Sequence, residues 1–341
     1  MTAGGSYAAA GVDIDAGERA VELMAGSVRG ATRSEVIGGI GGFAGLFDAS
    51  ALKSYRRPVL ATSTDGVGTK VSIAQRMGRH DTIGRDLVAM VLDDLVVCGA
   101  EPLFMTDYIA CGKVVPERIA AIVKGIADGC RDAGAALLGG ETAEHPGLMA
   151  ADEYDLAGAG TGVAEADEIL GPDRVRAGDV VIGLASSGLH ANGYSLVRHV
   201  FFTTLGWDLD RQVPELGRTL GEELLEPTRI YAADCLALSR NLGAGLHAFS
   251  HVTGGGFAAN LDRVVPAACR ARIDWSSWAT PPIFTMVGDL GNVPRDELRR
   301  ALNMGVGMAA IVDPGSVDAA IALLSERDLT AWVTGVVEPA A

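Results

Sequence analysis

The sequence predicts a two-domain protein of the α/β class, and three features lead to this prediction. The chain has 341 residues, which is enough for two domains with well-buried cores. Its second half alternates strand-like apolar runs with helix-like runs, a pattern typical of layered α/β structure. A polar segment rich in helix and strand breakers lies at residues 165–177. We therefore expect one domain over residues 1–166 and a second over residues 167–341.

The composition restricts the possible partners and the compartment. The formal net charge is −15, whereas binding to nucleic acids or anionic membranes requires clustered Lys and Arg, so we expect neither partner. The five cysteines show no C-x-x-C spacing and are expected to be free thiols in a reducing compartment. The sequence contains neither a signal-peptide pattern nor an apolar run of membrane-spanning length, and we expect a cytoplasmic protein.

The first half is expected to alternate helices with strands. A helix is predicted over residues 116–133, because Pro116 suits the first helical turn and Gly134 can end the helix in the left-handed conformation. Apolar spacing and flanking breakers predict the other elements in the same way. These are helices over residues 18–26 and 82–99, and strands over residues 58–62, 103–110, 135–138 and 154–165.

Five glycines fall within residues 38–45 and exclude a stable helix or a central strand there. This loop matches neither the P-loop pattern nor the dinucleotide-binding fingerprint. It is either a flexible linker or a segment whose backbone N–H groups, including those of Gly41 and Gly42, lie along phosphates.

The stretch Ser63–Lys70 combines residue types that suit a nucleotide site. Gly66 permits close approach of the backbone to a ligand, and Asp65 offers the hard oxygen ligands that magnesium prefers. Thr64 and Lys70 add a hydroxyl and a positive charge suited to phosphate oxygens. The alternative is that Asp-Gly simply closes a hairpin.

The next segment, residues 82–99, predicts a helix that is apolar around most of its circumference and therefore buried. It nevertheless contains Asp86, Asp93 and Asp94. Unpaired buried carboxylates cost several kcal/mol each, so these residues need a cation or hydrogen-bond donors. Either they lie on one solvated face of the helix, or they meet Asp65 around a divalent ion, which is the interpretation that we favour.

Two strand ends carry further polar candidates. Glu141 and Glu144 follow a short strand and are candidate ligands for a metal or a hydroxyl group. The turn at residues 186–193 joins a strand to a helix, which is where α/β sheets place ligands. His190 and Asn192 in this turn are either functional or ordinary turn residues.

The second half contains one more candidate loop. Thr253 and the three glycines that follow it precede a predicted helix and form a competent anion-binding nest, although three glycines can also be merely flexible. The remaining predicted elements are helices over residues 227–242, 258–265 and 316–327, and strands over residues 179–185, 303–312 and 331–337.

An ordered set of motifs covering nearly the whole chain resembles the phosphoribosylformylglycinamidine cyclo-ligase family. Each motif alone is weak, but the set in this order is specific. The motifs are Tyr7 with residues 10–17, and the segments 38–43, 64–70, 80–84, 86–90, 94–97, 99–103, 139–144, 186–188, 190, 192–198 and 251–256.

This resemblance implies a fold, a reaction and a set of site residues. It implies an N-terminal α+β domain whose sheet pairs across a homodimer into a barrel, and a C-terminal α/β domain. The implied reaction uses ATP and Mg²⁺ to close formylglycinamidine ribonucleotide to aminoimidazole ribonucleotide. The implied nucleotide site comprises Gly41, Gly42, Thr64, Asp65, Gly66, Asp94 and Glu141, and Asp65 and Asp94 of this set would bind the metal. The implied catalytic residues are His190 and Lys70. The implied substrate contacts are His190, Asn192, Thr253, Gly254 and Gly255.

Some positions depart from the family pattern, and two other functions stay open. Ala8 stands where relatives often carry Lys, Leu302 where many carry Phe, and the first helix lacks a lysine near Glu22. A phosphotransferase resembling thiamine-monophosphate kinase or selenophosphate synthetase is one alternative, although the latter would need a reactive N-terminal Cys or selenocysteine. A non-catalytic nucleotide-binding subunit is the other.

Overall fold

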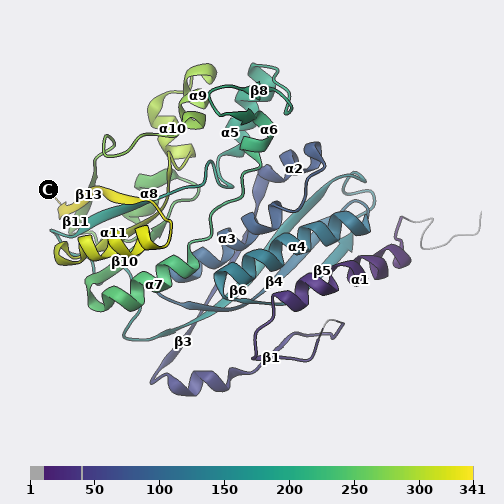
Figure 1. Cartoon of the computed structure of the whole chain (residues 1–341), viewed down its shortest axis with the longest axis horizontal. Coiled ribbons are helices and arrows are strands. Elements are labelled where there is room, and N and C mark those ends of the chain that lie inside the picture. Colours follow the sequence, from purple (N-terminus) through teal and green to yellow (C-terminus); the bar gives the residue numbers. More distant parts are fainter. Residues whose placement is uncertain (1–10, 40, 341) are drawn as a thin grey trace, which may run out of the picture.

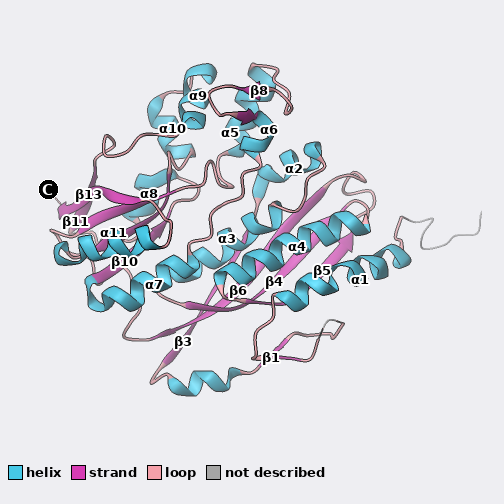
Figure 2. Cartoon of the chain, in the orientation of Figure 1, coloured by secondary structure: helices cyan, strands magenta, loops and turns pink. Residues whose placement is uncertain are grey.

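The computed structural model describes residues 11–39 and 41–340, so the motif residues Tyr7 and Ala8 lie outside the described part. The chain forms two sheets, each with its own helices (Figures 1 and 2). The first sheet has the strand order β3-β6-β4-β5, and the second has the order β10-β12-β7-β13-β11. The fold is thus a mixed α/β structure with two domains.

The first sheet is antiparallel except for the parallel pair β4–β5. Helices α3 and α4 cover one of its faces, and α1 packs on α4 (Figure 1). The elements of this half are α1 (Ile14–Gly30), β1 (Val36–Ile37), β2 (Leu46–Phe47), β3 (Pro58–Gly66), α2 (Val71–Met77), α3 (Ile83–Val96), β4 (Glu101–Cys111), α4 (Pro116–Ala133), β5 (Ala136–Glu144) and β6 (Tyr154–Glu165).

The second sheet is antiparallel throughout, and its strands β10, β12 and β7 are buried on both faces along most of their length. Every residue of β12 is buried, because α7 and α11 pack on one side of the sheet and α8 on the other. The elements of this half are β7 (Val180–Ala185), α5 (Tyr194–Arg198), β8 (Gln212–Val213), β9 (Arg218–Thr219), α6 (Leu220–Leu224), α7 (Ala232–Leu242), β10 (Leu246–His251), α8 (Gly256–Asp262), β11 (Cys269–Ile273), α9 (Pro282–Gly291), α10 (Arg295–Ala301), β12 (Val306–Val312), α11 (Val317–Glu326) and β13 (Ala331–Pro339). None of the helices in the described part combines the length and the hydrophobicity needed to cross a bilayer.

The predicted helix over residues 116–133 and the predicted strand over 154–165 are confirmed at both ends. The prediction of a helix over 227–242 is wrong at its start, since α7 begins at Ala232. The residues just before Ala232 instead form no regular secondary structure, and the backbone N–H groups of Thr228 and Tyr231 bind side chains of α3. The first helix is longer than predicted, because Asp13 caps it at Ala16.

Strand β3 continues through Asp65 and Gly66, so the Asp-Gly pair ends a strand and does not close a hairpin. The pair is followed by a short 3-10 turn over residues 68–70 and then by α2. This path carries the chain from the first sheet toward the second half of the molecule.

Close contact between α3 and α4 depends on glycine. A Cβ atom on Gly84 would collide with the carbonyl oxygen of Ile122 and the amide nitrogen of Ile126. The backbones of the two helices therefore approach at this point without an intervening side chain, which holds α3 firmly against its neighbour.

Strand β4 carries a carboxyl group that the core does not satisfy. Oδ1 of Asp107 lies against Gly140 of β5, where any Cβ atom would collide with it. Oδ2 is buried and has no hydrogen-bond partner in the described part of the chain. Burial raises the pKa of this carboxyl to about 7.

Replacing Gly84 with Ala is expected to destabilise the protein by about 1–3 kcal/mol, because the backbones of α3 and α4 must separate. Chemical denaturation of Gly84→Ala against the parent chain measures this loss. Gly26→Ala in α1 is the matched control, because nothing lies within 4 Å of the position that a Cβ atom on Gly26 would take. The control should gain about 0.5–1 kcal/mol, and equal effects of the two substitutions would contradict the role of close packing at Gly84.

Replacing Asp107 with Asn is expected to raise the melting temperature more at about pH 8 than at about pH 5. The folded-state pKa lies above the unfolded value, so the contribution of Asp107 to stability is most favourable at low pH and is lost as the pH rises through about 7. The neutral amide lacks this penalty. A difference in melting temperature that is the same at both pH values would show that Asp107 does not titrate as inferred.

Candidate functional site

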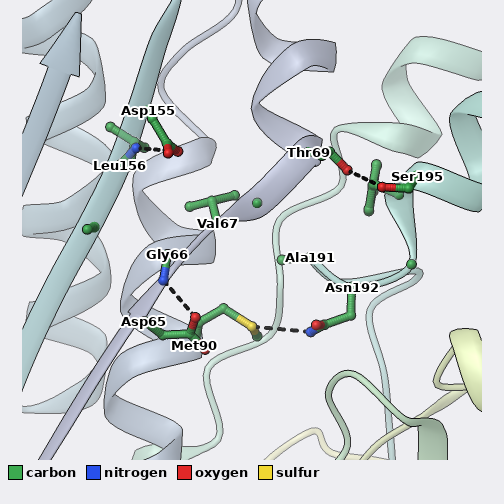
Figure 3. Close-up of a pocket in the computed structure, with 14 residues that line it drawn as sticks. Asp65, Gly66, Val67, Thr69, Met90, Asp155, Leu156, Ala191, Asn192 and Ser195 are labelled. Carbon is green, nitrogen blue, oxygen red and sulfur yellow. Dashed lines mark hydrogen bonds between the residues drawn. The ribbon is translucent and has the colours of Figure 1, made fainter.

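A groove of about 510 Å³ lies between the two halves of the molecule (Figure 3). One wall comes from the first half and comprises residues 65–69 together with the start of β6 at residues 155–157. The other wall is the turn at residues 191–195, and Met90 of α3 also lines the space. The groove therefore joins the glycine stretch after β3 to the turn after β7.

Asp65 and Asp94 both present exposed carboxylates near this groove. Asp65 stands at the end of β3, where its Oδ1 accepts a hydrogen bond from Gly66 N at 2.7 Å. Partial burial raises the pKa of Asp65, and the negative charge of Asp94 raises it further. Two carboxylates that repel each other in this way form an arrangement that a cation would stabilise.

His251 holds Asp94 from the other half of the molecule. Its Nδ1 lies 2.8 Å from Asp94 Oδ1, and its side chain is almost completely buried. Burial opposes the charged form of His251, but the hydrogen bond to Asp94 and the charge of Asp93 outweigh it and raise the pKa. His251 ends β10 and leads directly into the glycine nest at residues 253–256.

Asn192 connects the turn, α3 and the nest. Its Nδ2 lies 3.4 Å from the sulfur of Met90, as Figure 3 shows. Its Oδ1 would lie 3.7 Å from a Cβ placed on Gly254. The amide of Asn260 donates to the carbonyl oxygens of Thr253, Gly254 and Gly256, at 3.2, 3.1 and 2.9 Å, and so fixes the shape of the nest.

Thr64 and Glu141 are not brought to the same side of the sheet as Asp65. Register across β3, β6 and β4 places Asp65 on the same face as Asp107. Thr64 faces the other side by alternation, and so does Glu141, which pairs with Tyr108. The predicted grouping of Thr64 and Glu141 with Asp65 does not agree with this geometry.

The glycine loop lies beside the edge strand of the first sheet. Gly41 and Gly42 are exposed, and Gly41 has a positive φ of 104°. A Cβ on Gly45 would meet the backbone of Leu138 in β5. The loop is therefore placed along β5, the strand that carries Glu141.

Lys70 and His190 are buried, which does not agree with direct contact between either side chain and a ligand. Lys70 is 0% exposed, and its Nζ lies 2.8 Å from Asp86 Oδ1. His190 is 1% exposed, and its Nε2 accepts a hydrogen bond from Ser187 N at 3.1 Å. Burial lowers the pKa of His190, so its ring is neutral and supports the turn at residues 186–190.

The interpretation of Asp86 and Asp93 as metal ligands is wrong, and so is the alternative of a solvated face. Both residues are 0% exposed. Asp86 binds Lys70 and Thr228, and Asp93 accepts hydrogen bonds from Tyr231 N at 2.9 and 3.1 Å. Their hydrogen-bond donors come mainly from the segment before α7, which has no motif that sequence inspection could recognise as a partner.

Several participants in the site were not predicted from the sequence. Asp155 lines the groove at the start of β6 (Figure 3). Thr69 was a candidate phosphate contact, but its partner Ser195, whose Oγ lies 3.3 Å from Thr69 Oγ1 across the groove, was not predicted. Nothing in the sequence pairs residues 126 positions apart. His251 was recognised only as part of a motif, although a histidine directly before a glycine nest is a detectable pattern.

Comparison with known protein families gives matches over both halves of the chain. Residues 47–164 match the family "AIR synthase related protein, N-terminal domain". Residues 176–341 match "AIR synthase related protein, C-terminal domain".

Solved structures with similar folds include proteins of other functions. Thiamine-monophosphate kinase from Stenotrophomonas maltophilia superposes with a TM-score of 0.68 at 22% identity, covering 93% of this chain and 94% of that chain. The hydrogenase maturation protein HypE in complex with ATP superposes with a TM-score of 0.67 at 17% identity, covering 99% and 88%. At such low identity these similarities show the fold alone.

Curated relatives are much more similar in sequence and share one name. Phosphoribosylformylglycinamidine cyclo-ligase of Geobacillus kaustophilus is 51% identical over 332 residues, covering 97% of this chain and 95% of the relative. The protein of the same name from an Anaeromyxobacter species is 53% identical over 334 residues, covering 98% and 96%. These matches favour the cyclo-ligases over the phosphotransferases of similar fold. The chain therefore belongs to the phosphoribosylformylglycinamidine cyclo-ligase family.

Proposed function

We propose that the chain is an ATP-dependent ligase that closes formylglycinamidine ribonucleotide to 5-aminoimidazole ribonucleotide, with release of ADP and phosphate, in purine biosynthesis. One observation supports this function above the others. Asp94, a candidate nucleotide-site residue on α3, is hydrogen-bonded to His251, which leads into the candidate substrate nest. A group suited to the nucleotide and a segment suited to the ribonucleotide are thus joined directly across the two halves.

ATP is a substrate of this enzyme class, and we assign Asp65 and Asp94 to hold Mg²⁺ with it. The two residues fit the metal, because both are exposed carboxylates, and the negative charge of Asp94 adds to the effect of partial burial in raising the pKa of Asp65. The described residues contain no group of three or more metal-binding side chains. A two-carboxylate site agrees with the preference of Mg²⁺ for few protein ligands together with phosphate oxygens and water. When bound, the ion would neutralise negative charge on the phosphates.

The turn and the nest of the second half are assigned to the ribonucleotide substrate. Asn192 lines the groove and lies next to Gly254. Gly254 and Gly255 are exposed residues, and the backbone N–H groups of such a nest are suited to an anionic group such as the 5′-phosphate of the substrate. Thr253 adds a hydroxyl group. Phosphoryl transfer depends mainly on positioning and charge neutralisation, so these groups need no nucleophile of their own.

The other nucleotide contacts are proposed on the basis of the family alone. Gly41 and Gly42 would lie over the phosphates, and Gly66 in the groove wall would allow close approach of the ligand. We do not assign Thr64 or Glu141 to the site of Asp65, because both face the other side of the first sheet. We assign no direct ligand contact to Lys70 or His190, because both are buried.

We also propose that the enzyme is a cytoplasmic homodimer whose first sheets pair into a barrel. The face of this sheet opposite α3 exposes Leu60 and Tyr108, at 60% and 41%. Burial of such apolar surface would stabilise a dimer. All five cysteines are free, in agreement with a reducing compartment. The proposed domains are residues 1–166 and 167–341, with the linking segment between β6 and β7.

Release of ADP is expected to require both Mg²⁺ and formylglycinamidine ribonucleotide. A coupled assay of ADP, with each component omitted in turn, measures this requirement. Detection of 5-aminoimidazole ribonucleotide by mass spectrometry identifies the product. ADP release that continues unchanged without the ribonucleotide would contradict the proposed function.

Asp94→Asn is expected to weaken the use of ATP by at least ~2 kcal/mol, or roughly 30-fold in kcat/KM for ATP, because a carboxylate ligand of the metal is lost. Steady-state kinetics at varied ATP and Mg²⁺ measure the change. Asp318→Asn, on the exposed surface of α11, is the matched control and should leave kcat/KM unchanged. ATP kinetics of Asp94→Asn close to those of the parent chain would remove this residue from the nucleotide site.

A further inference from the structure

Lys70 follows directly on the first wall of the groove but points away from it into the protein. Its Nζ donates hydrogen bonds to Asp86 Oδ1 at 2.8 Å and to the carbonyl oxygen of Glu226 at 2.5 Å. It also lies 5.6 Å from the ring centre of Tyr194. Tyr194 belongs to the second wall, so this ammonium group touches segments that support both sides of the groove.

Asp86 extends the same connection to the segment before α7. Besides Lys70, its Oδ1 accepts hydrogen bonds from Thr228 N at 2.8 Å and from Thr228 Oγ1 at 2.6 Å. Nearby, Tyr194 Oη donates to the carbonyl oxygen of Leu224 at 2.7 Å. The 3-10 turn after β3, helix α3, the first residue of α5 and residues 224–228 therefore meet around one ion pair.

This ion pair is fully buried, and both side chains are 0% exposed. Removing two charges from water costs energy that their mutual attraction only partly returns, so a buried pair is weak support for a purely stabilising role. A buried pair with fixed hydrogen-bond geometry does, however, define the relative position of the segments it joins. Here it joins the turn that continues the first wall to α3 and to residues 226–228, and Tyr194 of the second wall packs against the same ammonium group.

We propose that Lys70 and Asp86 are positioning residues that set the distance and orientation between the two walls. The inference rests on the proposed function, in which one wall carries the nucleotide and the other carries the ribonucleotide substrate. Each substrate would still bind its own wall if the pair were lost. Transfer between them would suffer, since a misplacement of about 1 Å can lower a rate by about 100-fold.

The test separates stability from catalysis by neutralising the pair. Lys70→Met alone leaves Asp86 buried without its counter-ion and should lower the melting temperature strongly. The double variant Lys70→Met/Asp86→Asn keeps an oxygen acceptor for Thr228 and removes both charges, and its melting temperature should return toward that of the parent chain. Its kcat should stay at least about 20-fold low, while KM for ATP and for the ribonucleotide changes less than about threefold.

A matched double variant controls for the loss of an ion pair as such. Arg85 and Asp132 join α3 to α4 at 2.7 Å on the surface, outside the residues that line the groove. Arg85→Met/Asp132→Asn should therefore keep kcat within about twofold. Recovery of both stability and kcat by the Lys70/Asp86 double variant would overturn the proposal.

If the double variant does not fold, a milder variant tests the proposed positioning role. Thr228→Val removes the hydroxyl donor to Asp86 and preserves side-chain shape, and it should lower kcat several-fold with both KM values unchanged. An unchanged kcat for this variant would overturn the proposal. A parent chain without ribonucleotide-dependent ADP release would instead refute the proposed function, which distinguishes the two failures.

Discussion

Three carboxylates on a single apolar helix, two of them fully buried, join the two halves of the molecule. Asp86, Asp93 and Asp94 all lie on α3 and all bind groups from the second half: Thr228, the backbone of Tyr231, and His251. A carboxylate that leaves water must find hydrogen-bond donors, and within α3 itself the backbone N–H groups are already used. The second half supplies these donors, so the two halves have little freedom to shift.

The same helix also explains where the groove lies. Successive helical residues differ by about 100° in direction, so Asp93 and Asp94 point to different surroundings. Asp93 is enclosed beneath the segment before α7, whereas the Asp94 side chain is 42% exposed. One carboxylate therefore fixes the relative position of the halves, and its neighbour is left available to a ligand beside Asp65.

Asp94 is placed by contacts from both halves of the molecule, so the two proposed substrates can be brought together with few catalytic side chains. It belongs to the first half, but His251 orients it from the strand that leads into the glycine nest. Rigid placement of this kind suits a reaction that is governed by positioning. The buried Lys70–Asp86 pair also contributes to rigid placement. It lies near the start of α3, next to the first wall of the groove.

Local patterns in the sequence determined most of the elements and the family. Proline and glycine at the ends of α4, alternation in β6, and the ordered motifs were sufficient, because backbone conformation and short-range residue chemistry decide these features. The family resemblance selected Asp94 as the partner of Asp65, whereas residue chemistry alone did not separate Asp94 from Asp86 and Asp93. Polar residue type was not sufficient to identify ligand-facing side chains.

Only the tertiary structure decided which polar groups face the groove. Lys70 has the chemistry of a phosphate ligand, yet the partner Asp86 and the enclosing segment at residues 224–228 bury it. Glu141 follows the expected strand, but the register of β4 and β5 turns it to the other face of the sheet. Both outcomes depend on contacts between residues far apart in the chain. Burial and strand register are properties of those contacts, so they cannot be predicted from the residues next to Lys70 or Glu141 in the sequence.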